Sequence, residues 1–459
     1  MAKNFEEIQE SYFQWSQKSK QLMEPARRYM PGGDTRTTAH YLPYPVFMKK
    51  GAGCRIYDAD GHEYIDFMNN FTTLILGHAH PKVVGAVADQ VKLGTAYAAP
   101  TESQFELARL ICERVPSVEQ LRFCSSGSEA TMMAIRAARA FTGKQKVMKI
   151  EGGYNGNHDI GEISLVAIPT EAGPFEEPIT LQPDKGVPLS SVDGVIVTPF
   201  NEPEITEKLI KKHRDELCAI IMEPMMGALG MIAPMPGYLQ EMRRITKENE
   251  VLLIFDEVIT LRLSPAGLQG MAGIEPDLTA MGKIIGGGLP IGAFGGRKDI
   301  MQLFSPETAD FMWHASTFSG NPLTIAAGLA CMRELTPQVY DRLNAAGDAL
   351  RKGFNIAFDE IGIRGQATGL GSLVNLHMTD RPIRNARDSI TGLFGAGPIP
   401  MHLHLCMLQR GIFPAGRQMY CVSTPMTAKE IEKAVGALTE TLQELKPILE
   451  EDFPHLLKS

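Results

Sequence analysis

The chain has 459 residues, of which 44% are hydrophobic and 21% charged, and a formal net charge of −8. One compact core rarely serves so long a chain, so two or more packed units are expected. The negative charge argues against nucleic acid or an anionic membrane as the main partner, and no apolar run approaches the ~18 residues that cross a bilayer.

The N-terminal stretch and the cysteines indicate the cellular compartment. The N-terminal stretch MAKNFEEIQESYFQW is polar and acidic and lacks the apolar core of a signal peptide. The seven cysteines are scattered and include no CxxC pair, which is typical of buried thiols in a reducing compartment. We therefore expect a cytoplasmic protein, and no metal site is predicted.

Local patterns predict an α/β fold. After an amphipathic opening, residues 31–45 (PGGDTRTTAHYLPYP) indicate an extended loop, and the Asp-Gly within residues 52–67 predicts a hairpin. Short apolar runs then alternate with helix-like segments, at 121–126, 146–152, 194–200, 219–224, 252–258 and 292–296. Strands that are apolar on both faces and joined by helices predict a mostly parallel sheet covered on both sides. After about residue 323, a long helical stretch, GLGSLVNLHM, a further helix and an amphipathic tail indicate a smaller α/β domain.

The most informative segment contains a lysine at the end of an apolar run. In DLTAMGKIIGGGLPIGAFGG (277–296), Lys283 is followed by three consecutive glycines, which let the backbone approach a bound group closely. A lysine there is a candidate amine nucleophile if its surroundings lower its pKa. The alternative from this segment alone is a surface lysine before a Gly-rich turn.

Two further segments bear groups suited to a charged ring and a phosphate. Asp256 in IFDEV ends a very apolar strand, where a carboxylate is costly unless it is paired; it could instead cap the following helix. Ser126-Gly127-Ser128 closes a strand and opens an Ala-rich helix, and helix N-termini bind phosphate well. A simple serine N-cap is the alternative there.

These segments, in this order, resemble the class III aminotransferases, which are fold type I enzymes dependent on pyridoxal 5′-phosphate (PLP) and include glutamate-1-semialdehyde 2,1-aminomutase. The resemblance runs through PGGDTR, YDADGHEYIDF, LGHAHP, SSGSEA, EGGYNGNHD, IIMEP, IFDEV, MGKIIGGG, STFSGNP and STPMT. It implies a large domain with a mostly parallel seven-stranded sheet and a smaller α/β domain. We place the N-terminal part of the small domain at 1–75, the large PLP-binding domain at 76–323, and the C-terminal small domain at 324–459.

The resemblance also implies roles for single residues. Lys283 matches the lysine that forms the Schiff base with PLP, and Asp256 matches the carboxylate that pairs with the pyridine nitrogen. The other positions that match cofactor-binding residues are Ser126, Gly127 and Ser128 at the phosphate, Tyr154 stacked on the ring, Glu223 and Val258 near the ring, and Thr317 at the phosphate of a neighbouring subunit. Thr317 thereby implies a homodimer with shared active sites. The family usually has histidine where this chain has Asn155, which leaves the role of that position open.

Two arginines bear on the subfamily. Arg36 in the GGDTR loop and Arg417 in FPAGRQMYCVS match arginines that bind substrate carboxylates in β-amino acid aminotransferases, and arginine suits that task. Either one could also be a solvated loop residue. Asn70 and Phe71 align with residues that shape the side-chain pocket, although core packing explains Phe71 equally well.

The leading hypothesis is a transaminase that moves an amino group from an amino acid, a β-amino acid by the arginines, to a 2-oxo acid such as 2-oxoglutarate or pyruvate. The alternative is intramolecular transfer of the glutamate-1-semialdehyde aminomutase type, which the length of residues 155–190 favours. A PLP racemase and a non-catalytic PLP-binding protein rank lower.

Overall fold

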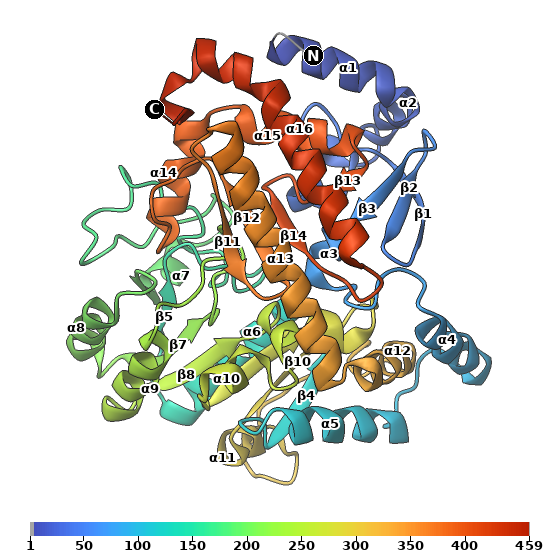
Figure 1. The fold of residues 1–459 in the computed structure, drawn as a ribbon. Coiled ribbons are helices and arrows are strands. Elements are labelled where there is room, and N and C mark those ends of the chain that lie inside the picture. The colour runs from blue at the N-terminus through green and yellow to red at the C-terminus, as the bar shows by residue number, and fades with distance from the viewer. Residues whose placement is uncertain (1–3, 459) are drawn as a thin grey trace. The chain divides into compact units, whose positions relative to one another are not determined.

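The computed structural model describes residues 4–458, and the chain forms two compact units (Figure 1). Unit 1 consists of residues 1–80, 342–382 and 392–459, and unit 2 of residues 81–341 and 383–391. Residues 1–3 of the predicted N-terminal part lie outside the described residues. The units divide the chain after residues 80 and 341, whereas the predicted domain limits lie at 75 and 323. The helix α12 (Pro322–Glu334) therefore belongs to unit 2 and not to the small domain.

Unit 2 is built on the predicted seven-stranded sheet, in the order β4-β10-β9-β8-β7-β5-β6. Its strands are β4 (Gln120–Cys124), β5 (Lys146–Ile150), β6 (Val195–Thr198), β7 (Leu217–Met222), β8 (Leu252–Asp256), β9 (Leu278–Gly282) and β10 (Gly292–Gly296). Only β10 pairs antiparallel to its neighbours, β4 and β9. The mostly parallel sheet is therefore confirmed, with one strand, β9, that the six apolar runs did not include.

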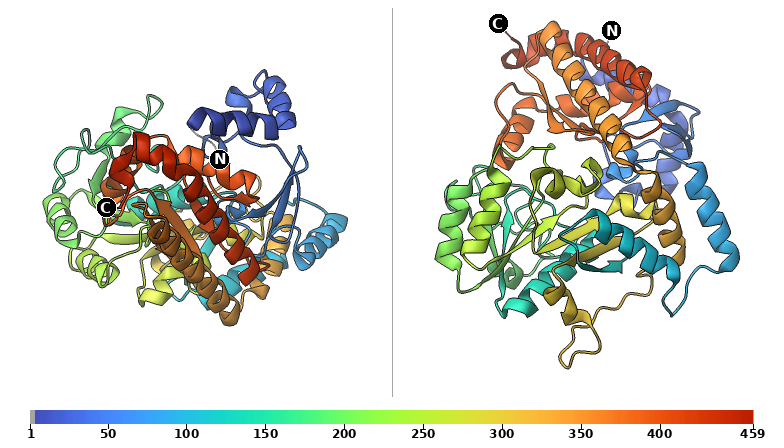
Figure 2. Two further views of the ribbon diagram at one scale, coloured as in Figure 1. Left: turned by 45° about the horizontal axis from the view of Figure 1, so that its top comes forward. Right: turned by 60° about the horizontal axis from the view of Figure 1, so that its bottom comes forward.

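The helices of unit 2 pack on this sheet and on one another. They are α4 (Pro81–Leu93), α5 (Glu102–Arg114), α6 (Gly127–Thr142), α7 (Leu189–Asp193), α8 (Pro203–His213), α9 (Tyr238–Glu248), α10 (Gly267–Ala272), α11 (Lys298–Met301) and α12, with 3₁₀ turns η3 (Thr260–Leu263), η4 (Lys283–Gly286) and η5 (Gln302–Phe304). The alanine-rich α6 packs on five strands and contributes small side chains to a buried hydrophobic cluster. In Figure 2, α12 runs beside α4, although the two are far apart in the sequence.

Unit 1 contains two small sheets. The predicted hairpin is confirmed as β2 (Arg55–Asp58) and β3 (Glu63–Asp66), which join β1 (Met48–Ala52) and the parallel strand β13 (Ile412–Phe413). A second, antiparallel sheet has the order β11 (Gln366–Leu370), β12 (Leu373–His377), β14 (Met419–Cys421). The helical elements with residues in this unit are α1 (Phe5–Trp15), α2 (Gln17–Ala26), η1 (Pro31–Gly33), η2 (Thr37–Ala39), α3 (Asn69–Thr72), α13 (Pro337–Ile361), α14 (Ala386–Ala396), α15 (Ile399–Gln409), α16 (Ala428–Asp452) and η6 (Pro454–Leu456).

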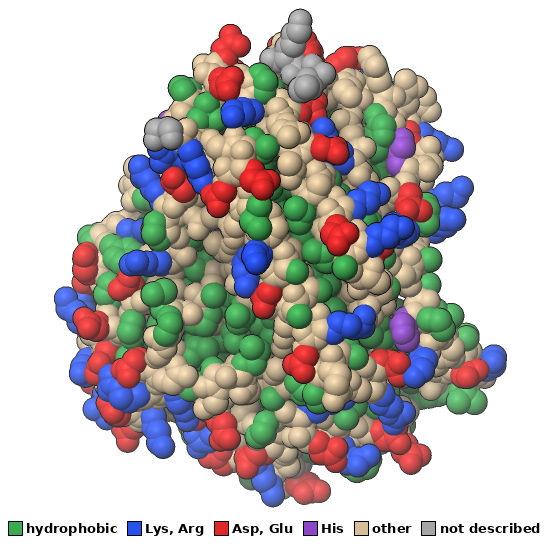
Figure 3. All heavy atoms as spheres, in the orientation of Figure 1, with side chains coloured by type: hydrophobic (Ala, Val, Ile, Leu, Met, Phe, Trp, Pro, Cys, Tyr) green, Lys and Arg blue, Asp and Glu red, His purple; other side chains and the backbone are tan. Residues whose placement is uncertain are grey.

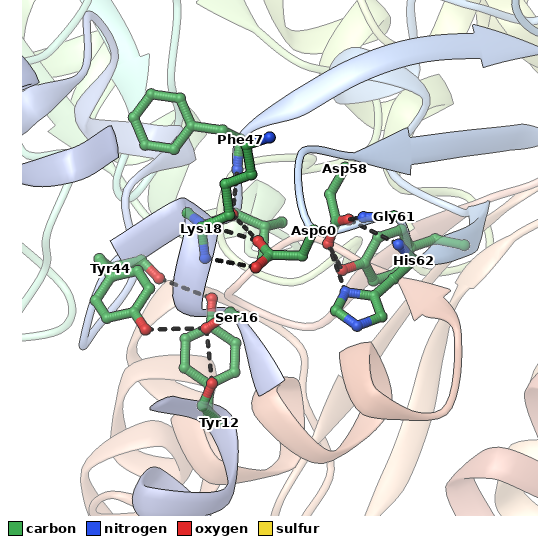
Figure 4. A network of polar contacts seen from close by, with 12 residues as sticks. Tyr12, Ser16, Lys18, Tyr44, Phe47, Asp58, Asp60, Gly61 and His62 are labelled. Atoms are coloured by element: carbon green, nitrogen blue, oxygen red, sulfur yellow. Dashed lines mark hydrogen bonds and ion pairs between the residues drawn. The ribbon is translucent and has the colours of Figure 1, made fainter. Parts of the chain in front are cut away.

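A carboxylate attaches the N-terminal helices to the hairpin, as Figure 4 shows. Asp60, in the turn between β2 and β3, accepts hydrogen bonds from the backbone N–H groups of Lys18 and Ser19, at 2.6 and 3.0 Å. These donors lie in the first turn of α2, where helix N–H groups lack partners of their own. Ser16 links the same corner to the following loop, since its hydroxyl lies 2.9 Å from that of Tyr44.

The charged side chains at the surface are of both signs, as the composition of the chain implies. On the face seen in Figure 3, acidic and basic side chains are interspersed among the described residues. All seven cysteines are free thiols, and six of them are buried. None of the helices within residues 4–458 combines the length and the apolar character of a membrane-spanning segment.

Candidate active site

Lys283 lies at the carboxyl end of a buried strand. All five residues of β9 are buried, and Lys283 then begins η4 with φ of 49°. The left-handed region is unusual for a residue other than glycine, and such strain tends to occur at functional sites. The glycine run has a packing reason as well, because a Cβ at Gly287 would lie 2.3 Å from the carbonyl oxygen of Ala327.

Asp256 ends β8, which is the parallel neighbour of β9, so both residues lie at the same edge of the sheet. Its carboxylate is buried and accepts hydrogen bonds from the amide of Asn155 and the backbone N–H of Val258, both at 3.1 Å. Burial raises the pKa of Asp256, and these donors and the positive charge of Lys283 oppose that rise. Lys283 is therefore close enough to Asp256 for its charge to act on the carboxylate.

The neighbouring acid, Glu257, has the structural role that was the alternative for Asp256. It is fully buried and accepts hydrogen bonds from the backbone N–H groups of Leu268 and Gln269, at 3.1 and 2.7 Å. The two acids of IFDEV thus have separate tasks: Glu257 fixes the following turn, and Asp256 faces Asn155.

Glu223 follows β7 and joins the same group. Burial, and secondly the charge of Asp256, raise the pKa of Glu223 to about 7. Its carboxylate accepts hydrogen bonds from the N–H groups of Gly227 and Tyr154, at 2.9 and 3.2 Å, and the positive charge of Lys283 lowers its pKa. The structure therefore brings together three of the predicted residues, Lys283, Asp256 and Glu223.

The predicted phosphate segment starts helix α6. The Ser126 hydroxyl caps the helix by accepting from the N–H of Glu129 at 3.2 Å, so Ser126 is the N-cap residue of α6. Gly127 has a separate reason to be glycine, because a Cβ there would lie 3.0 Å from the Val258 side chain. Val258 and the start of α6 therefore lie against each other.

Tyr154 and Asn155 lie on the loop that follows β5. Tyr154 is 37% exposed, and its backbone N–H donates to Glu223. Asn155 is buried, and its backbone oxygen accepts hydrogen bonds from Thr131 and His158. The sequence left the role of Asn155 open, and the structure shows that it is a hydrogen-bond donor to Asp256. Its position directly after Tyr154 in EGGYNGNHD was the available signal.

The residues of unit 2 suit the expected cofactor. PLP needs an amine for its aldehyde, an anion for its ring nitrogen, and N–H groups for its phosphate. Lys283, the buried carboxylate of Asp256 and the start of α6 provide these groups. The buried side-chain oxygen of Asn155 has no hydrogen-bond partner among residues 4–458, as expected where a further polar group would bind.

The four predicted substrate residues lie together in unit 1. Arg36 donates a hydrogen bond to the side-chain oxygen of Asn70 at 2.8 Å. The guanidinium carbons of Arg36 and Arg417 lie 5.8 and 5.7 Å from the centre of the Phe71 ring, within cation–π range. Phe71 is only partly buried. Its ring therefore contacts the two guanidinium groups and is not enclosed in a hydrophobic core.

The turn that carries Phe71 is strained. Four successive residues, Asn69 to Thr72, have positive φ, between 48° and 73°. Asparagine tolerates this conformation better than most residues, whereas phenylalanine and threonine do not. Such strain persists where the surrounding structure imposes it, which is common at binding sites.

Two cavities adjoin predicted residues. In unit 1, a cavity of about 650 Å³ is lined by Arg36 and Asn70, together with apolar side chains such as Met68. In unit 2, the exposed Thr317 lines a separate cavity of about 810 Å³. Its neighbour Ser316 contacts Ser125, hydroxyl to hydroxyl, at 3.1 Å. Both cavities have the size of small-molecule sites.

Comparisons with known proteins agree on one family. Residues 37–446 match the model of the class-III aminotransferases. A glutamate-1-semialdehyde 2,1-aminomutase of Methanothermobacter thermautotrophicus is 40% identical, over 94% of this chain and all of that protein. The crystal structure of an omega-transaminase from Sphaerobacter thermophilus is 44% identical with a TM-score of 0.89, covering 93% of this chain and 98% of that one. A β-phenylalanine aminotransferase from Variovorax paradoxus is 34% identical with a TM-score of 0.86, covering 96% and 97%.

Proposed function

Because this chain belongs to the class III aminotransferase family, we propose that it is a transaminase that moves the amino group of a β-amino acid to a 2-oxo acid. The enzyme uses PLP, which supplies an aldehyde for the amine and a ring that accepts electrons. The observation that carries the proposal is the placement of Arg36 and Arg417 at one phenylalanine ring.

Two guanidinium groups on one ring suit a substrate with a carboxylate and an apolar side chain. Arginine binds a carboxylate through two parallel hydrogen bonds, and Phe71 offers an apolar surface within about 6 Å of both cations. The β-phenylalanine aminotransferase relative combines the same two features in its named substrate. Arg36 and Arg417 would bind the carboxylates of the donor and of the 2-oxo acid.

The residues of unit 2 would hold the cofactor and move protons. Lys283 would carry the cofactor and transfer a proton between the Cα atom of the donor and the C4′ atom of the cofactor. Asp256 would keep the proton on the pyridine nitrogen. Ser126, Gly127, Ser128 and, from a second subunit, Thr317 would bind the phosphate, while Tyr154, Glu223 and Val258 would contact the ring.

An intramolecular aminomutase is the second candidate. The curated relatives at 36–40% identity bear the name glutamate-1-semialdehyde 2,1-aminomutase, and by these names alone the mutase is the better supported of the two. The solved relatives at 44% and 34% identity are a transaminase and an aminotransferase. Arg36 and Arg417 favour the transaminase, because the resemblance matches them to arginines that bind substrate carboxylates in β-amino acid aminotransferases.

The test is a panel of donors and acceptors with the parent enzyme and the variants Arg36→Ala and Arg417→Ala. A transaminase releases a keto product from β-phenylalanine only when a 2-oxo acid is present. We expect each variant to lower kcat/KM for carboxylated donors about 10- to 100-fold, the effect of losing a hydrogen bond to a charged group. The exposed Arg28→Ala is the matched control.

Two outcomes would contradict this proposal. Isomerisation of glutamate 1-semialdehyde without any exchange into a free 2-oxo acid would establish the mutase. Unchanged kcat/KM for carboxylated substrates in both arginine variants would remove the argument for a β-amino acid, while leaving the cofactor and the family unaffected. A homodimer with shared active sites and a cytoplasmic location remain predictions.

A further inference from the structure

Lys149 is a buried cation within the sheet of unit 2. It belongs to β5, which pairs with β6 on one side and β7 on the other, and its exposed fraction is 0%. The adjacent residues on the strand, Met148 and Ile150, are apolar and buried. Removing an ammonium group from water costs several kcal/mol unless partners compensate. A lysine at this position therefore needs a specific reason.

The partners of Lys149 are two backbone carbonyl groups. Its Nζ atom donates hydrogen bonds to the oxygen of Gly153 at 2.7 Å and to that of Ile163 at 2.6 Å. These oxygens stand at the first and last residues of one loop, residues 153–163. Just outside the loop, the N–H of Gly152 donates to the oxygen of Ser164 at 2.8 Å. The ammonium group therefore joins the two ends of the 153–163 loop.

This loop carries residues that contact both buried carboxylates of the candidate site. The backbone N–H of Tyr154 donates to Glu223 at 3.2 Å, and the side-chain amide of Asn155 donates to Asp256 at 3.1 Å. Within the loop, the N–H of Asn155 donates to the oxygen of Gly161 at 3.1 Å. In this arrangement of the loop, Asn155 lies at the end of β8 and Tyr154 lies near the end of β7.

The side chain of Asn155 cannot fix its own direction. Its amide nitrogen has Asp256 as a partner, but its amide oxygen is buried and has no hydrogen-bond partner among the described residues. An amide held at one atom takes its position from the backbone that carries it. The backbone oxygen of Asn155 is bound by Thr131 and His158, and its backbone N–H by Gly161 within the loop that Lys149 closes.

Charge supports the same arrangement. Burial lowers the pKa of Lys149 to about 7, and the carboxylates of Glu223, Asp256 and Glu162 oppose that fall. The cation therefore lies close enough to both carboxylates of the site to offset part of their negative charge.

We propose that Lys149 is a positioning residue for Asp256, and that it acts through the 153–163 loop and Asn155. By holding the oxygens of Gly153 and Ile163, its ammonium group fixes the backbone from which the Asn155 amide reaches the Asp256 carboxylate. The inference rests on the role of Asp256 in the proposed function, but the first measurement below does not depend on that role.

The first test is hydrogen exchange of the full chain, with and without PLP, in the parent and in Lys149→Met. Methionine keeps the length of the side chain and removes the donors. We expect the amides of Tyr154 and Asn155 to exchange about 10-fold faster or more, with β7 and β8 unchanged, because two hydrogen bonds to a charged group are lost. The control is Lys146→Met on the same strand, whose Nζ binds Glu216 at the surface. Unchanged exchange in the loop would overturn the inference.

The second test separates positioning from general stabilisation by a double-mutant cycle on the Kd of PLP. Lys149→Met and Asn155→Ala should each weaken binding about 10-fold. If Lys149 acts through Asn155, the double variant should bind no more than about twofold more weakly than Asn155→Ala. If the two increases in the Kd of PLP multiply in the double variant, Lys149 acts independently of Asn155, and the inference is overturned. Faster loop exchange with unchanged PLP affinity in both single variants would instead overturn the proposed role of Asp256.

A further variant covers the case in which Lys149→Met does not fold. Lys149→Gln removes the charge but keeps an amide donor for one carbonyl, and it should show smaller changes of the same kind in both measurements. If neither variant folds while Lys146→Met does, Lys149 serves the fold as a whole, and the inference fails.

Discussion

At the scale of single residues, the site combines groups whose burial acts against their charge. Asp256, Glu223 and Lys149 are all buried, and each would titrate differently in water. Burial disfavours the charged form of each, while the opposite charges of its neighbours restore part of the balance. Perturbed groups of this kind gather at functional sites.

Replacing Lys283 by alanine should abolish turnover. The variant should also lose the visible absorbance of bound PLP that borohydride would otherwise trap, because no other amine takes its place. Absorption spectra and activity of the full chain measure both effects. Lys298→Ala, at the exposed start of α11, is the control and should behave as the parent does. Full activity of Lys283→Ala with added PLP would contradict the proposed mechanism.

The pH dependence of stability should reveal Glu223. Its pKa in the folded protein, about 7, lies above the ordinary value of 4.5, so the folded state binds the proton more tightly than the unfolded state does. Its contribution is therefore complete below about pH 4.5 and is lost as the pH rises through about 7. At about 1.4 kcal/mol per pKa unit, the loss is on the order of 3 kcal/mol.

The measurement is urea unfolding of the PLP-free protein at several pH values between 4.5 and 7, the range that the two pKa values define. Relative to the parent, Glu223→Gln should become more stable as the pH rises through this range. Glu450→Gln, at an exposed site on α16, should follow the parent. Parallel curves for the parent and Glu223→Gln would show that the pKa of Glu223 is ordinary.

At the scale of helices and strands, the sequence was informative where one local pattern determines one element. The Asp-Gly hairpin and six of the seven strands of the large sheet were predicted in this way. The apolar run before Lys283, LTAMG, was not among these six predicted strands because it is short and contains threonine, alanine and glycine. It is a strand because β8 and β10 flank it.

The direction of β10 could not be predicted either. A Cβ at Gly295 would lie 2.5 Å from the Gln120 oxygen, so its glycines serve close packing against β4 that only the folded structure shows. The candidate site followed the same rule. Lys283 and Asp256 were predicted from motifs, and the structure places both at the same edge of the sheet. Lys149 has no such signal in the sequence, because its partners are carbonyl groups of a loop. The left-handed turn at Asn69–Thr72 has no sequence signal beyond its two asparagines.

The attachment of α2 to the hairpin gives a prediction at this scale. Asp60→Ala removes the acceptor of two backbone N–H groups and of the Ser19 hydroxyl. We expect it to lower the free energy of unfolding by about 1–3 kcal/mol, measured by urea denaturation. Asp89→Ala is the control, because Asp89 forms an exposed ion pair with Lys92 that contributes little. An equal loss in both variants would show that the contacts of Asp60 are unimportant.

At the scale of the whole molecule, exposed aromatic side chains bear on assembly. Trp313 is 74% exposed and Phe105 66%, and Phe105 lines the same cavity as Thr317. Large apolar side chains grouped at a surface mark interfaces. They support the predicted homodimer, in which Thr317 would complete the site of a second subunit.

Sedimentation velocity tests the dimer. The parent should sediment as a dimer at micromolar concentration, and the double variant Phe105→Ser/Trp313→Ser should shift toward monomer and lose activity in parallel. Leu189→Ser, which removes an equally exposed apolar side chain elsewhere in unit 2, should do neither. An active parent monomer would disprove shared active sites.

The pairing of β3 with β13 has a consequence for biosynthesis. Ile65 pairs with Ile412, so Ile65 acquires this neighbour only after more than 340 further residues have left the ribosome. At roughly 5–20 residues per second, that interval is on the order of 20–70 seconds. Throughout it, the apolar side chains of the nascent N-terminal segment have nothing to pack against from the chain's other end. A messenger truncated before codon 412 should therefore yield a product that depends on chaperones, even though the segment encoding the large sheet is intact.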